Sequence, residues 1–143
     1  MRARLPTRGE EGSVTIWMLG VCIMVLFLGG ISLDLWRVFV ERRDLAARVD
    51  AAAIAGASGI DEAAFRDRDV VVLDPDRAEA MAWDNLRSQD PDPSLVSQAI
   101  AATPDQITVT ATGTVRFTLL GVLLPNDPFT VRVSATVSPE GSP

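Results

Sequence analysis

The chain has 143 residues, a length that allows one modest domain beside a membrane anchor, and its formal net charge is −6. From Ala51 onward, thirteen acidic residues outnumber six arginines, and this balance argues against nucleic-acid binding, which needs Lys or Arg against phosphates. The chain contains no His, Lys or Tyr, and its single cysteine, Cys22, cannot form an intramolecular disulfide.

Residues 13–33 form an uncharged, largely apolar run of 21 residues. At the α-helical rise such a run is about 31 Å long, close to the hydrocarbon thickness of a bilayer. A domain this small has no interior wide enough to cover such a helix on all sides, so we predict a transmembrane helix. A cleaved signal peptide is disfavoured, because the run is longer than about 7–15 residues and no A-x-A site follows it.

The orientation of this helix follows from the size of its flanks. Three arginines precede the run and four follow it closely, so the positive-inside rule does not decide. Long domains translocate largely regardless of charge, whereas a short tail is easily retained. We therefore predict a single-pass protein of the cytoplasmic (inner) membrane. Residues 1–12 form a cytoplasmic tail, and residues 58–143 form a small extracytoplasmic domain.

The helical pattern continues beyond the membrane as an amphipathic stalk over residues 34–57. No proline or glycine interrupts residues 31–55, and Gly56 and Gly59 are plausible stops. Apolar residues recur there at spacings of three and four, and this stripe packs either on the protein's own domain or on neighbouring subunits. The stripe consists of Leu35, Val38, Leu45, Val49, Ala52 and Ala53. Within the membrane, the small residues that permit close helix packing are Gly20, Gly29, Gly30 and Ser32.

The distal region is expected to begin with short helices. Residues 58–75 read as a loop, and residues 76–89 as a helix capped by Asp74 or Asp76. The clustered apolar side chains of residues 94–101 indicate one further short helix.

After Pro104 the apolar period changes to two, which predicts strands. They are expected over residues 107–112, 115–119 and 129–137, with a turn at residues 125–128. The fold class is therefore α+β: a long N-terminal transmembrane helix continues as an amphipathic stalk and packs on a small antiparallel sheet of about three strands, with one or two short helices.

The sequence predicts no catalytic residues, no cofactor and no metal site. Without His or Lys, the common general bases and amine nucleophiles are missing, and zinc would lack ligands. The acidic clusters near residues 61–76 and 90–92 lack the spacing of an EF-hand loop. We expect a protein that is not an enzyme.

A short tail ending in Gly12-Ser13-Val14 leads into the apolar run, Leu33-Asp34-Leu35 closes it, and the alanine-rich VDAAAIAGA follows at residues 49–57. This order of features, over residues 8–57, resembles the N-terminal region of the TadE/TadG-like proteins of the tight adherence (Flp) pilus system. The resemblance implies a minor-pilin-like or accessory component of pilus assembly or secretion. Its partners would be the lipid bilayer and other pilus or secretion subunits. With those subunits it would form a homo- or hetero-oligomer through the N-terminal helix.

Two departures from the family pattern refine this expectation. Prepilin-type processing would cut between Gly12 and Ser13, but Trp17 stands where processed pilins carry Glu, so we expect an uncleaved anchor. The chain also lacks the Asp-x-Ser-x-Ser motif of a von Willebrand A domain and is identified as a short form without it. An alternative of another class is a signal-anchored envelope module that binds a ligand or cell-wall component.

Overall fold

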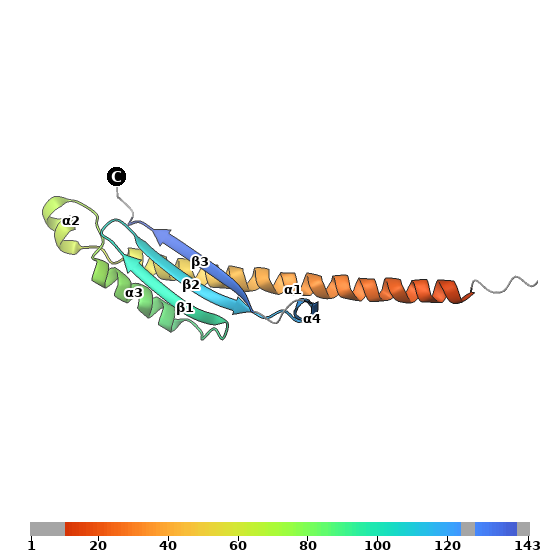
Figure 1. The fold of residues 1–143 in the computed structure, drawn as a ribbon. Helices are drawn as coiled ribbons and strands as arrows, with labels where there is room; N and C mark the ends of the chain where they lie inside the picture. The colour runs from red at the N-terminus through yellow and green to blue at the C-terminus, as the bar shows by residue number, and fades with distance from the viewer. Residues whose placement is uncertain (1–10, 124–127, 140–143) are drawn as a thin grey trace, which may run out of the picture.

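The computed structural model describes residues 11–123 and 128–139. Figure 1 shows one long helix whose C-terminal half lies along a small sheet, while its N-terminal half extends away from the other described elements. In chain order the elements are α1 (Glu11–Ala57), α2 (Glu62–Arg68), α3 (Pro75–Ser88), β1 (Leu95–Ala102), β2 (Ile107–Val115), α4 (Leu120–Leu123) and β3 (Phe129–Val137).

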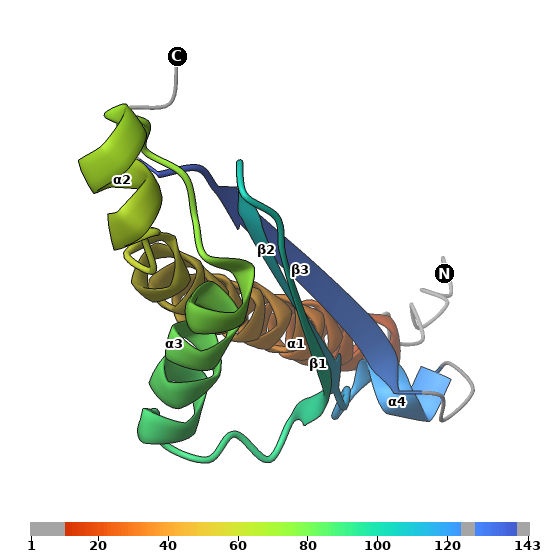
Figure 2. The same cartoon turned by 90° about the vertical axis from the view of Figure 1, so that its left-hand side faces the viewer.

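The three strands form one antiparallel sheet in the order β1-β2-β3. Along β2 the side chains alternate between the two faces, as the period of two predicts: Ile107, Val109 and Ala111 are buried. The opposite face is polar, and the hydroxyls of Thr108 and Thr136 lie 2.9 Å apart across the β2–β3 pair. Figure 2 shows α1 and α3 together on one face of the sheet, which leaves the threonine face uncovered.

The core lies between this sheet and the second half of α1. Leu45, Val49 and Ala52 of α1 are buried, and α1 contacts α3, β2 and β3. Gly56 permits the closest approach, because a Cβ at this position would collide with Ile107 of β2 and come 2.9 Å from the carbonyl oxygen of Ala78 in α3. The predicted α+β class is confirmed, with a long apolar helix that packs on a three-stranded sheet.

Two details of the predicted secondary structure are wrong. Residues 94–101, expected to be helical, lie almost entirely in strand β1, which pairs with β2 so that Ile100 faces Val109. The expected strand over residues 115–119 is absent, because β2 continues through Gly113 to Val115 and the chain then turns into α4. The sheet has three strands as expected, but β1 is one of them.

The short helices are defined by local caps. The side chain of Asp74 accepts from the backbone N–H of Arg77 at 3.3 Å, and Pro75 opens α3 one residue before the predicted start. Helix α2 lies inside the predicted loop, where the Asp61 side chain accepts from the backbone of Ala63 and Ala64. Of the predicted turn at residues 125–128, residues 125–127 lie outside the described residues.

Candidate functional site

The first half of α1 is apolar, and the other described elements leave it almost uncovered. Helix α1 is long enough and apolar enough to cross a membrane. Only 6% of its apolar 18-residue stretch is buried. A core helix of a soluble domain would be mostly buried, so the fold itself argues against that alternative. Large side chains such as Ile16 and Leu26 are more than 70% exposed.

The small residues predicted for packing in the membrane fall into different environments. Among the described residues, an added Cβ at Gly20 or Gly29 would meet no atom within 4 Å apart from its chain neighbours and the backbone of α1 itself. Gly30 is covered instead by the side chain of Leu119, and the hydroxyl of Ser32 donates to the carbonyl of Leu28 at 2.8 Å. Gly12 and Ser13, between which prepilin-type processing would cut, lie in the first turn of α1.

The predicted stalk stripe lies mostly against the protein's own domain. Four of its six residues are buried in the core, Val38 is partly buried, and Leu35 remains 49% exposed. The four buried residues are Leu45, Val49, Ala52 and Ala53. The stripe therefore supplies the attachment between α1 and the sheet.

The opposite side of the stalk is free of contacts with the described core. Leu45 is nine residues from both Trp36 and Ile54, which at 3.6 residues per turn places these two on the face directly opposite it. Trp36 is 68% exposed and Ile54 is 61% exposed, and Val40 and Ala47 between them are also exposed. We call Trp36, Val40, Ala47 and Ile54 the outward face; their helical spacing was the signal available in the sequence.

A second feature, not predicted from the sequence, joins α1 to the β2–β3 connection. Asp34 is only 2% exposed, and its carboxylate accepts from three successive backbone N–H groups at the start of α4. The distances to its Oδ2 are 3.1 Å from Thr118 N, 2.7 Å from Leu119 N and 2.9 Å from Leu120 N. One carboxylate thus serves the donors that a helix N-terminus leaves unpaired.

The surroundings of Asp34 reinforce this junction. The Arg37 guanidinium, one turn further along α1, donates to the Thr118 hydroxyl at 2.6 Å. The side chain of Leu119 lies so close to Gly30 that any Cβ there would collide with it. The N–H of Leu120, with those of Thr118 and Leu119, holds the pKa of the Asp34 carboxyl below its ordinary value, although burial acts in the opposite direction. Asp34, the first charge after the apolar run, is therefore stabilised as a carboxylate.

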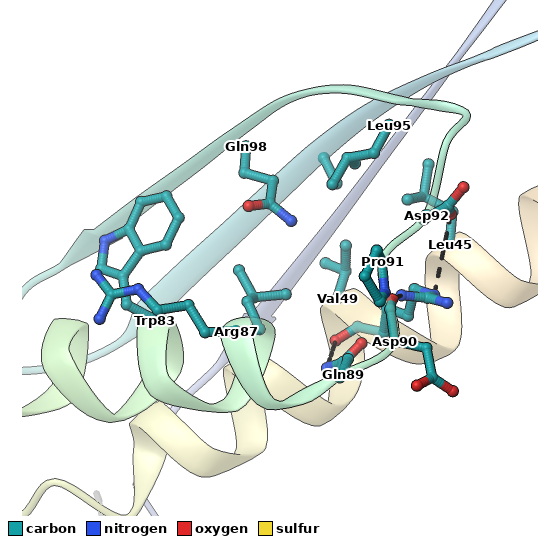
Figure 3. Close-up of a pocket in the computed structure, with 13 residues that line it drawn as sticks. Leu45, Val49, Trp83, Arg87, Gln89, Asp90, Pro91, Asp92, Leu95 and Gln98 are labelled. Atoms are coloured by element: carbon teal, nitrogen blue, oxygen red, sulfur yellow. Dashed lines mark hydrogen bonds and ion pairs between the residues drawn. The ribbon is translucent and has the colours of Figure 1, made fainter.

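A groove of about 490 Å³ lies between α1, α3 and β1. Figure 3 shows Trp83 on the α3 side and Gln98 on the β1 side, with α1 along the base. Its polar groups largely bind one another: Arg48 donates to the carbonyl of Asp90 at 2.7 Å and lies 3.9 Å from the Asp92 carboxylate. This arrangement fastens the end of α3 to the stalk.

The Asp92 carboxyl of this groove has a pKa below its ordinary value. The hydroxyl of Ser94, at 2.7 Å, lowers the pKa of Asp92, and the Ser94 N–H and the Arg48 charge act in the same direction against burial. Within the described residues, no group of three His, Cys, Asp or Glu side chains is placed to hold a metal ion.

Comparison with known proteins gave one match. The family model for Tad, described as Flp pilus-assembly TadE/G-like, matches residues 12–59. No curated protein and no solved structure matched the chain. The match covers α1 and the turn that follows it, including Asp34 and the outward face. Residues 12–59 of this chain are therefore a TadE/G-like segment, and the family predicted from the sequence is confirmed.

Proposed function

We propose that this protein is a non-enzymatic, membrane-anchored component of Flp/Tad pilus assembly or secretion, either minor-pilin-like or accessory. One observation carries the proposal: the TadE/G-like match over residues 12–59 coincides with helix α1, Glu11–Ala57. The part of the chain that relates it to pilus assembly is thus the part that is long and apolar enough to span a membrane. The helix is both the anchor and the principal contact with other subunits.

In this proposal residues 13–33 cross the inner membrane. The tail over residues 1–12 stays in the cytoplasm, and residues 34–143 project outside as the stalk and the distal domain. The absence of charge from residues 13–33 supports the membrane segment, and the size of the distal domain supports its translocation.

Contacts with other subunits use the surfaces of α1 that the distal domain leaves free. The stripe around Leu45 and Val49 is occupied by the chain's own sheet, so it is not available to a neighbour. In the membrane, Gly20 and Gly29 offer open backbone against which another helix can pack closely. Outside it, the outward face presents Trp36 and Ile54 five helical turns apart on one side.

The proposal is tested by deleting the gene in its native host and measuring the Flp pilin sheared from the cell surface. We expect the deletion to abolish surface pili and the wild-type chain to restore them. The variant Ile54→Glu, on the outward face, should accumulate normally and fail to restore pili. The matched control Thr136→Glu, exposed on the sheet, should restore them. Normal piliation of the deletion strain would overturn the proposal.

A further inference from the structure

The connection between β2 and β3 lies beside the part of α1 that enters the membrane. Leu119 packs on Gly30, and Gly30 is three residues inside the end of the uncharged run at Leu33. At the helical rise this places Leu119 about 4.5 Å within the run. At the other end of the sheet Ile107 packs on Gly56, 26 residues or about 39 Å further along α1. Residues 117–123, at the described start of this connection, are thus the membrane-proximal tip of the distal domain, as Figure 1 shows for α4.

The composition of this tip suits an apolar environment. Residues 117–123 read FTLLGVL and carry no charge. Leu119 and Leu120 are only partly covered by the rest of the fold, and Phe129, whose ring centroid lies 5.9 Å from that of Phe117, is 48% exposed. A tip that faced water would leave these apolar side chains without a partner.

Three backbone N–H groups of the tip are hydrogen-bonded within the protein and do not need water as a partner. A backbone N–H in the hydrocarbon region costs several kcal/mol unless it is bonded within the protein, so only satisfied backbone can lie there. Asp34 accepts from the N–H groups of Thr118, Leu119 and Leu120, the donors that a short helix cannot pair internally.

Beside the Asp34 carboxylate, which the backbone N–H groups of the tip surround, two arginines at this level have the sign that a phospholipid surface attracts. Arg37 comes four residues after the end of the run and donates to Thr118, and Arg116 is exposed at the start of the tip. Arginine side chains in this position extend their guanidinium groups toward lipid phosphates while apolar neighbours enter the acyl boundary.

We propose that the α4 tip, residues 117–123, is a second membrane contact that inserts into the outer boundary of the bilayer beside the anchor. The proposal depends on the membrane anchor assigned above, and its occupant is the lipid bilayer. Two contacts on the same leaflet hold the distal domain at a fixed tilt and rotation about α1. The outward face of the stalk is then presented in one direction relative to the membrane plane.

The test uses the full chain with Cys22→Ser and one new cysteine, labelled with the environment-sensitive fluorophore NBD. The protein is reconstituted into phosphatidylcholine–phosphatidylglycerol vesicles with or without lipids that carry a doxyl quencher on the acyl chain, placed near the headgroup to probe the tip and near the end of the chain to probe the anchor. The positions compared are Val25→Cys in the anchor, Leu120→Cys in the tip and Thr136→Cys at the far end of the sheet. Circular dichroism checks that each variant is folded, and Phe117→Cys replaces the tip variant if Leu120→Cys is not.

We expect blue-shifted emission and loss of emission with doxyl lipid at positions 25 and 120, and neither at position 136. Quenching at position 25 without quenching at position 120 would overturn the second contact and leave the anchor intact. A blue shift at position 120 that doxyl lipid does not quench would also overturn it, since the tip would then be covered by protein. No quenching at position 25 would overturn the anchor and, with it, the inserted tip.

Discussion

The carboxylate of Asp34 lies 2.7 Å from the backbone nitrogen of Leu119, although the two residues are 85 positions apart in the chain. This contact joins the end of the apolar run to the connection between the last two strands. The distal domain is consequently held to α1 at two levels: the core around Leu45 and Val49, and the junction at Asp34. A rotation of the anchor would therefore be transmitted to the whole sheet.

Removal of the Asp34 carboxylate should release the α4 tip. In Asp34→Ala the N–H groups of Thr118, Leu119 and Leu120 lose their acceptor, so we expect them to lose protection from hydrogen exchange. Asp34→Asn keeps one carbonyl oxygen and should retain part of the protection. Asp44→Asn, an exposed acid on the same helix, is the control and should change none of it. Equal protection in wild type and Asp34→Ala would contradict the assigned junction.

Gly29 and Gly30 are neighbours with different expected roles. Gly30→Ile places a branched side chain where Leu119 lies, and overpacking of this kind costs about 1–3 kcal/mol of unfolding free energy. Gly29→Ile meets open space and should leave the stability of the isolated chain unchanged. If Gly29 packs against another subunit, its variant should instead reduce piliation. Denaturant unfolding in micelles measures the effect of each variant on stability, and the pilus assay measures its effect on assembly. Equal losses of stability in Gly29→Ile and Gly30→Ile would contradict this prediction.

Asp92 should make stability depend on pH in the acidic range. Its pKa in the folded chain is lowered by the Ser94 hydroxyl, the Ser94 N–H and the Arg48 charge. A carboxyl with a lowered folded pKa makes its full contribution to the free energy of unfolding above its unfolded pKa of about 3.9. That contribution is lost as the pH falls through the lower folded pKa. We therefore expect wild type to lose more stability than Asp92→Asn between about pH 5 and pH 2, measured as unfolding midpoints. Parallel curves for the two proteins would exclude this role for Asp92.

The two sides of the stalk should respond differently to truncation. Leu45 is 2% exposed, and Leu45→Ala should lower the free energy of unfolding by about 2–5 kcal/mol. Ile54→Ala, on the outward face, should change it by no more than about 0.5 kcal/mol. Denaturant unfolding measures both, followed by the fluorescence of Trp83, which packs against the core, in a background with Trp17→Phe and Trp36→Phe. A large loss from Ile54→Ala would mean that the outward face is part of the fold.

The mature N-terminus tests the prediction of an uncleaved anchor. Because Trp17 occupies the position at which processed pilins carry Glu, mass spectrometry of the protein from membranes should recover peptides that extend upstream of Gly12. A mature chain that begins at Ser13 would show that prepilin-type processing takes place.

Local signals predicted the helices that depend on neighbouring residues. The uninterrupted apolar period predicted α1, and Asp74 was one of the two caps predicted for α3. The Asp61 cap is a comparable signal for α2, with Arg66 and Arg68 in its last turn, although the sequence of residues 58–75 predicts a loop.

What depends on distant contacts could not be predicted from local patterns. The alanine-rich β1 has apolar side chains that fit a helix equally well, and pairing with β2 decides its conformation. The Asp34 junction joins segments more than 80 residues apart, and nothing near Leu33-Asp34-Leu35 indicates its partner. The outward face, by contrast, could have been found from the helical spacing of Trp36 and Ile54 once Leu45 was assigned to the core.

Site-specific crosslinking in piliated cells tests the central claim most directly, namely that α1 binds other pilus subunits through its free surfaces. A photoreactive phenylalanine analogue is placed at Ile54 or Trp36 on the outward face, and at Thr136 on the sheet as the control. The proposal predicts adducts with Flp pilin or another Tad component from positions 54 and 36, identified by mass spectrometry, and none from position 136. Adducts from position 136 alone, or none from the outward face in cells that assemble pili, would contradict it.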